Sequence, residues 1–276
     1  MNVTRRFSIL APLALGACAA MESRLEPAQE KLSAWDKAAN AQIDSWKTTL
    51  FAQQAKDAQG RWAALEKRSG GRLGVAVLGG GRVFAAHRGD ERFAMCSTFK
   101  LALAALILRE AELGRLRLDE KIPYGESDLQ EHAPVAKEHL AEGGMSALDL
   151  ARATQTTSDN TAANLLLARL GGPEGFTQRL RAIGDSVTRL DRMEPEMNRV
   201  AAGDPRDTTT PIAYAQTALV FTTGDVLTPE HRAILVQWMR ETQTGAARLR
   251  AAMPADWNAG DKTGTGAGNA IPNKTN

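Results

Sequence analysis

Residues 95–108 read MCSTFKLALAALIL, and this stretch decides the fold. Lys100 is its only charged residue, and the apolar run that follows predicts a buried helix from about residue 98 to residue 113. Residues three apart lie on one face of a helix, so the Ser97 hydroxyl and the Lys100 amine are expected within reach of each other. Burial disfavours the ammonium form of a lysine, so Lys100 is a candidate proton acceptor for a serine nucleophile.

Two further motifs follow in the same chain, Ser158-Asp159-Asn160 and Lys262-Thr263-Gly264. An S-x-x-K pattern is expected about once by chance in a chain of this length, whereas each tripeptide is expected in roughly one chain in twenty. Three motifs in this order are therefore a specific signal. Competing patterns are weaker, because no G-x-S-x-G occurs and the four histidines lack the spacing of zinc ligands.

Apolar periodicity predicts the remaining elements. Helices are expected at 53–68, 98–113, 146–155, 160–170, 173–183, 210–221 and 229–241. A hairpin is expected from strands 72–78 and 82–87 around the glycine triplet 79–81, and strand character returns at 257–266. A long polar connection, about 184–211, is typical of a functional loop. The order of elements suggests a mixed sheet with a helical part inserted between its strands.

The three motifs together resemble those of the class A serine β-lactamases, over about residues 53–266. The same resemblance is carried by MCSTFK at 95–100, RMEPEMN at 192–198 and DKTGTG at 261–266. It implies an α/β (α+β) fold shared with penicillin-binding proteins, in which a helical part is inserted in an antiparallel sheet flanked by helices. Family members continue through further strands and a final helix, so the last strands and the C-terminal helix are expected to be missing.

The resemblance also implies how the chain is divided. Residues 53–94 and 242–276 would form the α/β sheet part, 95–241 an all-α part, and 184–211 an Ω-type loop at the active site. Cys96 would be a free, buried thiol, because Gly266 stands where some relatives carry a partner cysteine.

The activity implied is hydrolysis of the β-lactam amide of penicillins and cephalosporins through a Ser97 acyl-enzyme, which confers β-lactam resistance. The catalytic residues would be Ser97, Lys100, Ser158, Glu194 and Lys262. The backbone N–H groups of Ser97 and Thr265 would form the oxyanion hole. Substrate-binding roles are implied for Asn160, Asn198, Thr263, Thr265, Arg248 and His132, and a structural ion pair for Arg192 with Asp207.

Composition restricts the partners. The 34 basic and 32 acidic residues give a net charge of +2, which is too balanced for a dedicated nucleic-acid binder. With 43% hydrophobic residues the chain belongs to the ordinary globular class. We expect a monomer that acts on a small-molecule β-lactam and uses no metal or other cofactor.

The first eighteen residues are typical of an export signal. Arg5 and Arg6 precede an apolar run, 9–17, that is shorter than the roughly 20 residues of a membrane-spanning helix. The run ends at Cys18 in a lipobox-like sequence, so a periplasmic enzyme is expected, with Cys18 a candidate site for a lipid anchor. Both twin-arginine and general secretion remain open. Residues 19–52 carry an apolar stripe at helical spacing, which predicts an amphipathic helical stalk.

Two alternative functions remain at this stage. A penicillin-binding D,D-peptidase-like protein shares the first three motifs but has no need for Glu194 and Asn198. An inactive, truncated envelope lipoprotein would instead use its N-terminal helix for contacts.

Overall fold

The computed structural model describes residues 37–38, 41–42, 53–254 and 256–266. The chain divides into two units, Met1–Gln54 and Ala55–Asn276, and the second contains the three motifs around Ser97, Ser158 and Lys262. The expected export signal 1–18, with Cys18, lies outside the described residues. The expected stalk 19–52 also lies outside them, apart from residues 37–38 and 41–42, which are helical.

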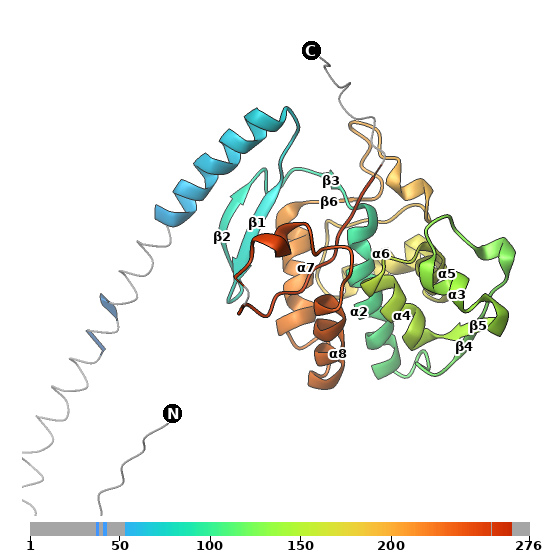
Figure 1. Cartoon of the computed structure of the whole chain (residues 1–276). Helices are drawn as coiled ribbons and strands as arrows, with labels where there is room; N and C mark the ends of the chain where they lie inside the picture. Colours follow the sequence, from blue (N-terminus) through green and yellow to red (C-terminus); the bar gives the residue numbers. More distant parts are fainter. Residues whose placement is uncertain (1–36, 39–40, 43–52, 255, 267–276) are drawn as a thin grey trace, which may run out of the picture. The chain divides into compact units, whose positions relative to one another are not determined.

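Helices are the main regular structure of the second unit (Figure 1). Residues 53–69 form a helix. The labelled helices are α2 (Phe99–Glu112), α3 (Pro134–Glu138), α4 (Ala147–Thr156), α5 (Asn160–Arg169), α6 (Gly172–Ala182), α7 (Pro211–Thr223) and α8 (Pro229–Arg240). All seven expected helices are present with ends shifted by two residues or fewer, whereas the five-residue α3 was not predicted. None of the helices described is long and apolar enough to cross a membrane.

The core is built around α2, which packs against α4, α5, α7 and α8. Eleven of its fourteen residues are buried, so the helix is covered on nearly every side. This explains why its sequence is apolar without the polar stripe of a surface helix. Lys100, the second residue of the helix, is buried as well.

Local capping sets where the surrounding helices begin. The side chains of Ser146, Asp159, Thr210 and Thr228 accept hydrogen bonds from backbone N–H groups in the first turns of α4, α5, α7 and α8. Such caps satisfy donors that the helix itself leaves unpaired. The Asp159 cap matters for the site, because it makes Asn160 the first residue of α5 and leaves Ser158 in the turn before it.

Short antiparallel strand pairs complete the structure. Strands β1 (Val75–Gly79) and β2 (Arg82–His87) form the expected hairpin. Its turn residues Gly80 and Gly81 have φ of 55° and 76°, a conformation that favours glycine. The other pairs are β3 (Phe93–Ala94) with β6 (Thr208–Thr209), and β4 (Lys121–Pro123) with β5 (Gly144–Ser146). The stretch 95–241, expected to be all helical, thus also contains β4, β5 and β6.

The expected strand at 257–266 is wrong, because the described residues from 256 to 266 contain no strand. The reason lies in the bonding of Asp261. Its N–H donates to the Met239 carbonyl at 3.0 Å, and its carbonyl accepts from Gln155 Nε2 and Thr242 Oγ1, each at 2.9 Å. Helices α4 and α8 and the turn after α8 therefore supply the hydrogen bonds that a neighbouring strand would have supplied.

Candidate active site

Ser97 lies in a single 3-10 turn, Cys96–Thr98, which leads directly into α2. Cys96 has a φ of 45°, an uncommon and strained value for a residue with a side chain. This turn sets Ser97 Oγ 3.2 Å from Lys100 Nζ and 3.3 Å from Glu194 Oε1. The helical spacing of Ser97 and Lys100 thus brings their side chains into contact, as expected.

Lys100 is completely buried and contacts both the Ser158 motif and Glu194. Its ammonium lies 2.9 Å from Glu194 Oε1 and 2.9 Å from the Ser158 carbonyl, and it donates to Asn160 Oδ1. Burial lowers the pKa of Lys100, and the carboxylate of Glu194 acts against that shift. Lys100 is therefore placed to exchange a proton with either Ser97 or Glu194.

Ser158 connects Lys100 to the third motif. It occupies the turn between α4 and α5 with a φ of 63°, again uncommon for a residue with a side chain. Its Oγ accepts a hydrogen bond from Lys262 Nζ at 3.0 Å and lies 3.5 Å from Lys100 Nζ. Burial, together with the charge of Lys100, lowers the pKa of Lys262 to about 7. Two lysines thus share one hydroxyl, which gives a short path for a proton.

Glu194 is held from two directions. Its Oε2 accepts a hydrogen bond from the Asn198 side chain, which follows it by four residues in the loop. Its backbone is bonded reciprocally to Asn164, with Asn164 Nδ2 2.9 Å from the Glu194 carbonyl and the Glu194 N–H 3.0 Å from Asn164 Oδ1. Asn164 belongs to none of the motifs recognised in the sequence. Its position four residues after Asn160, on the same face of α5, is a signal that could have indicated it.

The loop that carries Glu194 is closed at its base by acidic and basic side chains. Arg192 and Asp207 form an ion pair in which the Asp207 carboxylate is completely buried. The same carboxylate accepts hydrogen bonds from the N–H groups of Asp191 at 2.7 Å and Arg192 at 3.0 Å. One aspartate therefore joins the two ends of the loop through both side-chain and backbone contacts.

Residues 261–266 pass beside the nucleophile turn. A Cβ placed on Gly264 would lie 2.8 Å from the Met95 carbonyl oxygen, and one on Gly266 would lie 2.5 Å from Cys96 Sγ. Only glycine permits this close approach of the two segments. Cys96 is a free, buried thiol, as expected, and burial raises its pKa. The side chain of Thr265 is exposed.

The three remaining expected residues are placed differently. Thr263 Oγ1 lies 2.6 Å from Thr244 Oγ1. His132 is exposed at the edge of the site, where its Nε2 lies 3.0 Å from the Thr157 carbonyl. Arg248 is exposed as well, and within the described part of the chain its side chain makes no hydrogen bond or ion pair. Arg250, two residues later, instead contacts the Lys262 segment through an ion pair with Asp261 at 3.0 Å.

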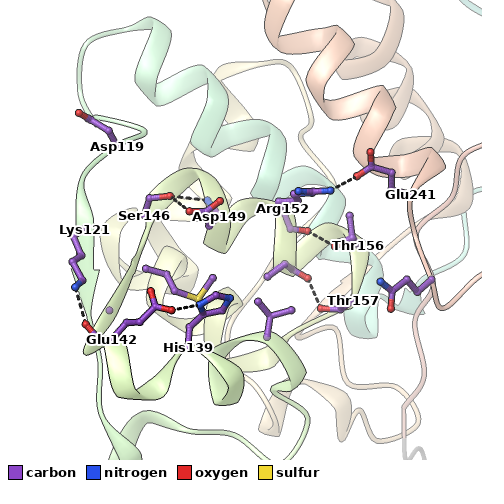
Figure 2. A pocket seen from close by; sticks show the side chains of 15 residues that line it. Asp119, Lys121, His139, Glu142, Ser146, Asp149, Arg152, Thr156, Thr157 and Glu241 are labelled. Atoms are coloured by element: carbon purple, nitrogen blue, oxygen red, sulfur yellow. Dashed lines mark hydrogen bonds and ion pairs between the residues drawn. The ribbon is translucent and has the colours of Figure 1, made fainter.

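A cavity of about 890 Å³ lies beside the C-terminal end of α4, where Thr156 and Thr157 belong to its lining (Figure 2). Its lining includes the ion pairs Arg152–Glu241 and His139–Glu142. Thr157, the neighbour of Ser158, belongs to its wall, but Ser97 and Lys100 do not. The lining contains neither Ser97 nor Lys100, and four of its charged or titratable side chains are paired with one another, so we place the candidate chemistry in the Ser97 cluster and not in this cavity.

The Ser97 cluster suits acyl transfer. It combines a hydroxyl at the start of a helix, a buried lysine beside it and a buried carboxylate on the other side. Among the described residues no group of three or more histidine, cysteine or acidic side chains could hold a metal ion.

Comparisons with known proteins agree with this chemistry. The model of the β-lactamase enzyme family matches residues 58–270. The chain is 48% identical to β-lactamase CTX-M-8 of Citrobacter amalonaticus, covering 79% of this chain and 74% of the relative. It is 50% identical to β-lactamase L2 of Stenotrophomonas maltophilia, covering 74% of this chain and 67% of that relative.

A solved structure gives the same answer for the fold. The ancestral (GNCA) class A β-lactamase matches with a TM-score of 0.74 and 56% sequence identity, over 76% of this chain and 80% of that chain. The expected fold class is thereby confirmed. Sequence, fold and family model together show that this chain belongs to the class A β-lactamases, hydrolases of the β-lactam amide bond.

Proposed function

We propose that Ser97 is the nucleophile that becomes acylated when the chain hydrolyses penicillins and cephalosporins. The observation that carries this proposal is the position of Ser97 Oγ, within hydrogen-bond distance of both Lys100 Nζ and Glu194 Oε1. A serine hydroxyl becomes an effective nucleophile only when a neighbouring base accepts its proton. Both candidate bases are buried, which strengthens their interaction with the hydroxyl.

In the acylation step, Ser97 Oγ forms a bond to the carbonyl carbon and the amide C–N bond of the ring breaks. The serine proton passes either to Lys100 directly or, through a water, to Glu194, and Ser158 delivers a proton to the departing ring nitrogen. The contact of Ser158 Oγ with both Lys262 and Lys100 supports this path. The oxyanion would be bound by the backbone N–H groups of Ser97 and Thr265, near the positive end of α2.

In the deacylation step, a water attacks the ester carbonyl and Glu194 accepts its proton. The ester bond to Ser97 Oγ then breaks, the proton returns to Ser97 Oγ, and the ring-opened acid is released. The hydrogen bond from Asn198 to Glu194 supports a shared role in holding that water. This step distinguishes a hydrolase from a penicillin-binding protein, in which the acylated serine persists. The family match therefore favours the first of the three functions considered from the sequence.

The remaining residues are proposed to bind the substrate. The carboxylate of a penicillin or cephalosporin would lie near Lys262, Thr263 and Thr265, and the exposed Arg248 would add a positive charge at the edge. Asn160 and His132 would contact the acylamino side chain of the substrate. The packing of Gly264 on the nucleophile turn supports this arrangement, because it brings the Lys262 segment close to Ser97.

The cellular setting is proposed from the sequence. Residues 1–18 would direct export to the periplasm, where β-lactam hydrolysis gives resistance, and Cys18 is a candidate for lipid attachment. The enzyme would act as a monomer. We also propose that residues 53–94 and 242–276 form the sheet part, 95–241 the helical part and 184–211 the loop that carries the deacylation base.

A mass measurement tests the proposal. The chain is incubated with a penicillin, and the mass of the peptide that contains Ser97 is followed with time. An adduct that appears and then disappears, together with release of the ring-opened acid, supports the hydrolase. A persistent adduct supports a penicillin-binding protein, and no adduct at all contradicts acylation at Ser97. Ser97→Ala is the control that must give no adduct.

A further inference from the structure

The Thr263 hydroxyl, proposed above to bind the substrate carboxylate, already has a partner. Its Oγ1 lies 2.6 Å from Thr244 Oγ1, although the two residues are nineteen positions apart. Thr244 is exposed, so the contact is not a consequence of core packing. A hydroxyl has one proton to donate, and the direction of this hydrogen bond therefore determines whether Thr263 keeps its proton for the substrate.

The loop that carries Thr244 is fastened at both ends. On one side, the Gln243 N–H donates to the Thr156 carbonyl at 2.9 Å. On the other side, Arg250 donates to the carbonyls of Arg240 and Thr242 and forms an ion pair with Asp261. These bonds connect the loop to helix α4 and to the segment that contains Thr263.

Residue 245 adds a further restraint on the same loop. A Cβ on Gly245 would lie 2.0 Å from Asp261 Oδ1, so the loop backbone lies directly against the Asp261 carboxylate. Thr244, the residue before it, is thereby held opposite Thr263. The hydroxyl pair is thus a fixed feature of the site and not a chance contact of two surface side chains.

The electrostatic surroundings favour one direction for this hydrogen bond once a substrate arrives. Lys262 Nζ donates to the Thr263 carbonyl at 2.8 Å, so positive charge lies next to the hydroxyl pair and attracts an anion. A carboxylate oxygen accepts hydrogen bonds but donates none. Thr263 must then donate to the carboxylate, and its own oxygen is left free to accept the Thr244 proton.

We infer that Thr244 is a positioning residue, which turns the Thr263 hydroxyl so that its proton points to the carboxylate of the substrate. This inference rests on the proposed function, in which Thr263 binds that carboxylate. Two hydroxyls in series polarise each other, so the hydrogen bond to the anion is stronger than a single hydroxyl provides. Thr244 therefore increases the preference of the enzyme for β-lactams that carry a free carboxylate over neutral ones.

The test compares Thr244→Val, which keeps the shape but removes the hydroxyl, with Thr244→Ser, which keeps the hydroxyl. Each variant and the unsubstituted enzyme are assayed with a chromogenic cephalosporin and with the methyl ester of the same compound. For the free acid we expect Thr244→Val to raise KM about fivefold with kcat within twofold, the effect of losing one hydrogen bond. For the ester, Ser97 acylation, followed by intact mass, should have the same rate in all three proteins.

Thr244→Ser should restore the KM of the unsubstituted enzyme. An unchanged KM in Thr244→Val would overturn the inference, and so would an equal loss with the acid and the ester, since that result indicates a general disturbance of the site. Failure of the proposed function has a different signature, because the unsubstituted enzyme would then acylate with neither compound.

Discussion

The two sides of the catalytic site are held by different kinds of structure. The helical side, defined as Ser97, Lys100, Ser158, Asn160 and Glu194, joins the ends of α2, α4 and α5 to the loop after α6. The extended side, defined as residues 261–265, belongs to no helix or strand and is fully or partly accessible to solvent. On the helical side the Lys100 and Glu194 side chains are completely buried.

This difference separates two tasks. In the proposed mechanism the helical side contains most of the groups that move protons, and burial lowers the pKa of one of them, Lys100. The extended side would bind the substrate carboxylate through donors that keep some exposure to solvent, and it also supplies Lys262 to the proposed proton path. We therefore expect substitutions on the helical side to change the rate of a chemical step, and substitutions on the extended side to change KM. The following four predictions test this division.

The largest effect is expected for Glu194→Ala on the helical side. Removal of the proposed base should slow deacylation by about 1000-fold, within the range for general-base catalysis, so that the acyl-enzyme accumulates. Intact-mass spectrometry after addition of a penicillin measures the amount of acyl-enzyme. The matched control is Glu196→Ala, because Glu196 is an exposed carboxylate two residues away in the same loop. Rapid turnover by Glu194→Ala would show that another group activates the water.

Asn164→Ala should have the next largest effect, because it leaves the buried N–H and carbonyl of Glu194 without partners. Unpaired buried groups cost about 1–3 kcal/mol each, so the free energy of unfolding should fall measurably in urea. Deacylation should slow by about 10- to 100-fold as Glu194 loses its fixed position. An equal slowing of acylation would instead indicate a general loss of structure.

The pH profile tests Lys262 on the extended side. Its pKa is lowered to about 7 by burial and by Lys100, so the ammonium loses its proton as the pH rises through that value. The attraction for the substrate carboxylate is then lost, and kcat/KM should fall about tenfold for each pH unit above about 7. Lys262→Arg keeps its charge and should move this fall to higher pH. A flat profile of the unsubstituted enzyme up to pH 9 would contradict the assignment.

The smallest effect is expected for Gln155→Leu, which removes the hydrogen bonds from Gln155 Nε2 to the Asp261 carbonyl and to Thr242. The segment 261–265 should be held less firmly against α4, so KM should rise about threefold and the free energy of unfolding should fall by about 1 kcal/mol. The control is Arg152→Leu on the same helix, which removes an ion pair at the surface with Glu241 and should change little. A large fall in kcat for Gln155→Leu would show that the two sides are not separable.

The sequence predicted the helical side well. The apolar run after Lys100 and the three motifs are local patterns, and local spacing is enough to place side chains on one helix face. Asn164 was not predicted because an asparagine on a helix is usually a surface residue. Only the path of the loop after α6 brings the Glu194 backbone next to it.

The extended side shows where sequence patterns are insufficient. A strand was expected at 257–266, but whether a segment forms a strand depends on a neighbour that can pair with it. Here the backbone N–H and carbonyl of Asp261 are hydrogen-bonded to Met239, Gln155 and Thr242, and no strand forms. The short strands β4, β5 and β6 were missed for the related reason that two or three residues carry too little periodicity to recognise.

What the sequence by itself determined is which groups are present: a serine one turn before a buried lysine, with the Ser158 and Lys262 motifs and Glu194 in their order along the chain. What only the tertiary structure decided is how these groups are held, through Asn164 on Glu194, Thr244 on Thr263 and Arg250 on Asp261. The physical reason is that helix geometry fixes contacts between residues three or four apart, whereas hydrogen bonds between segments depend on the path of the whole chain.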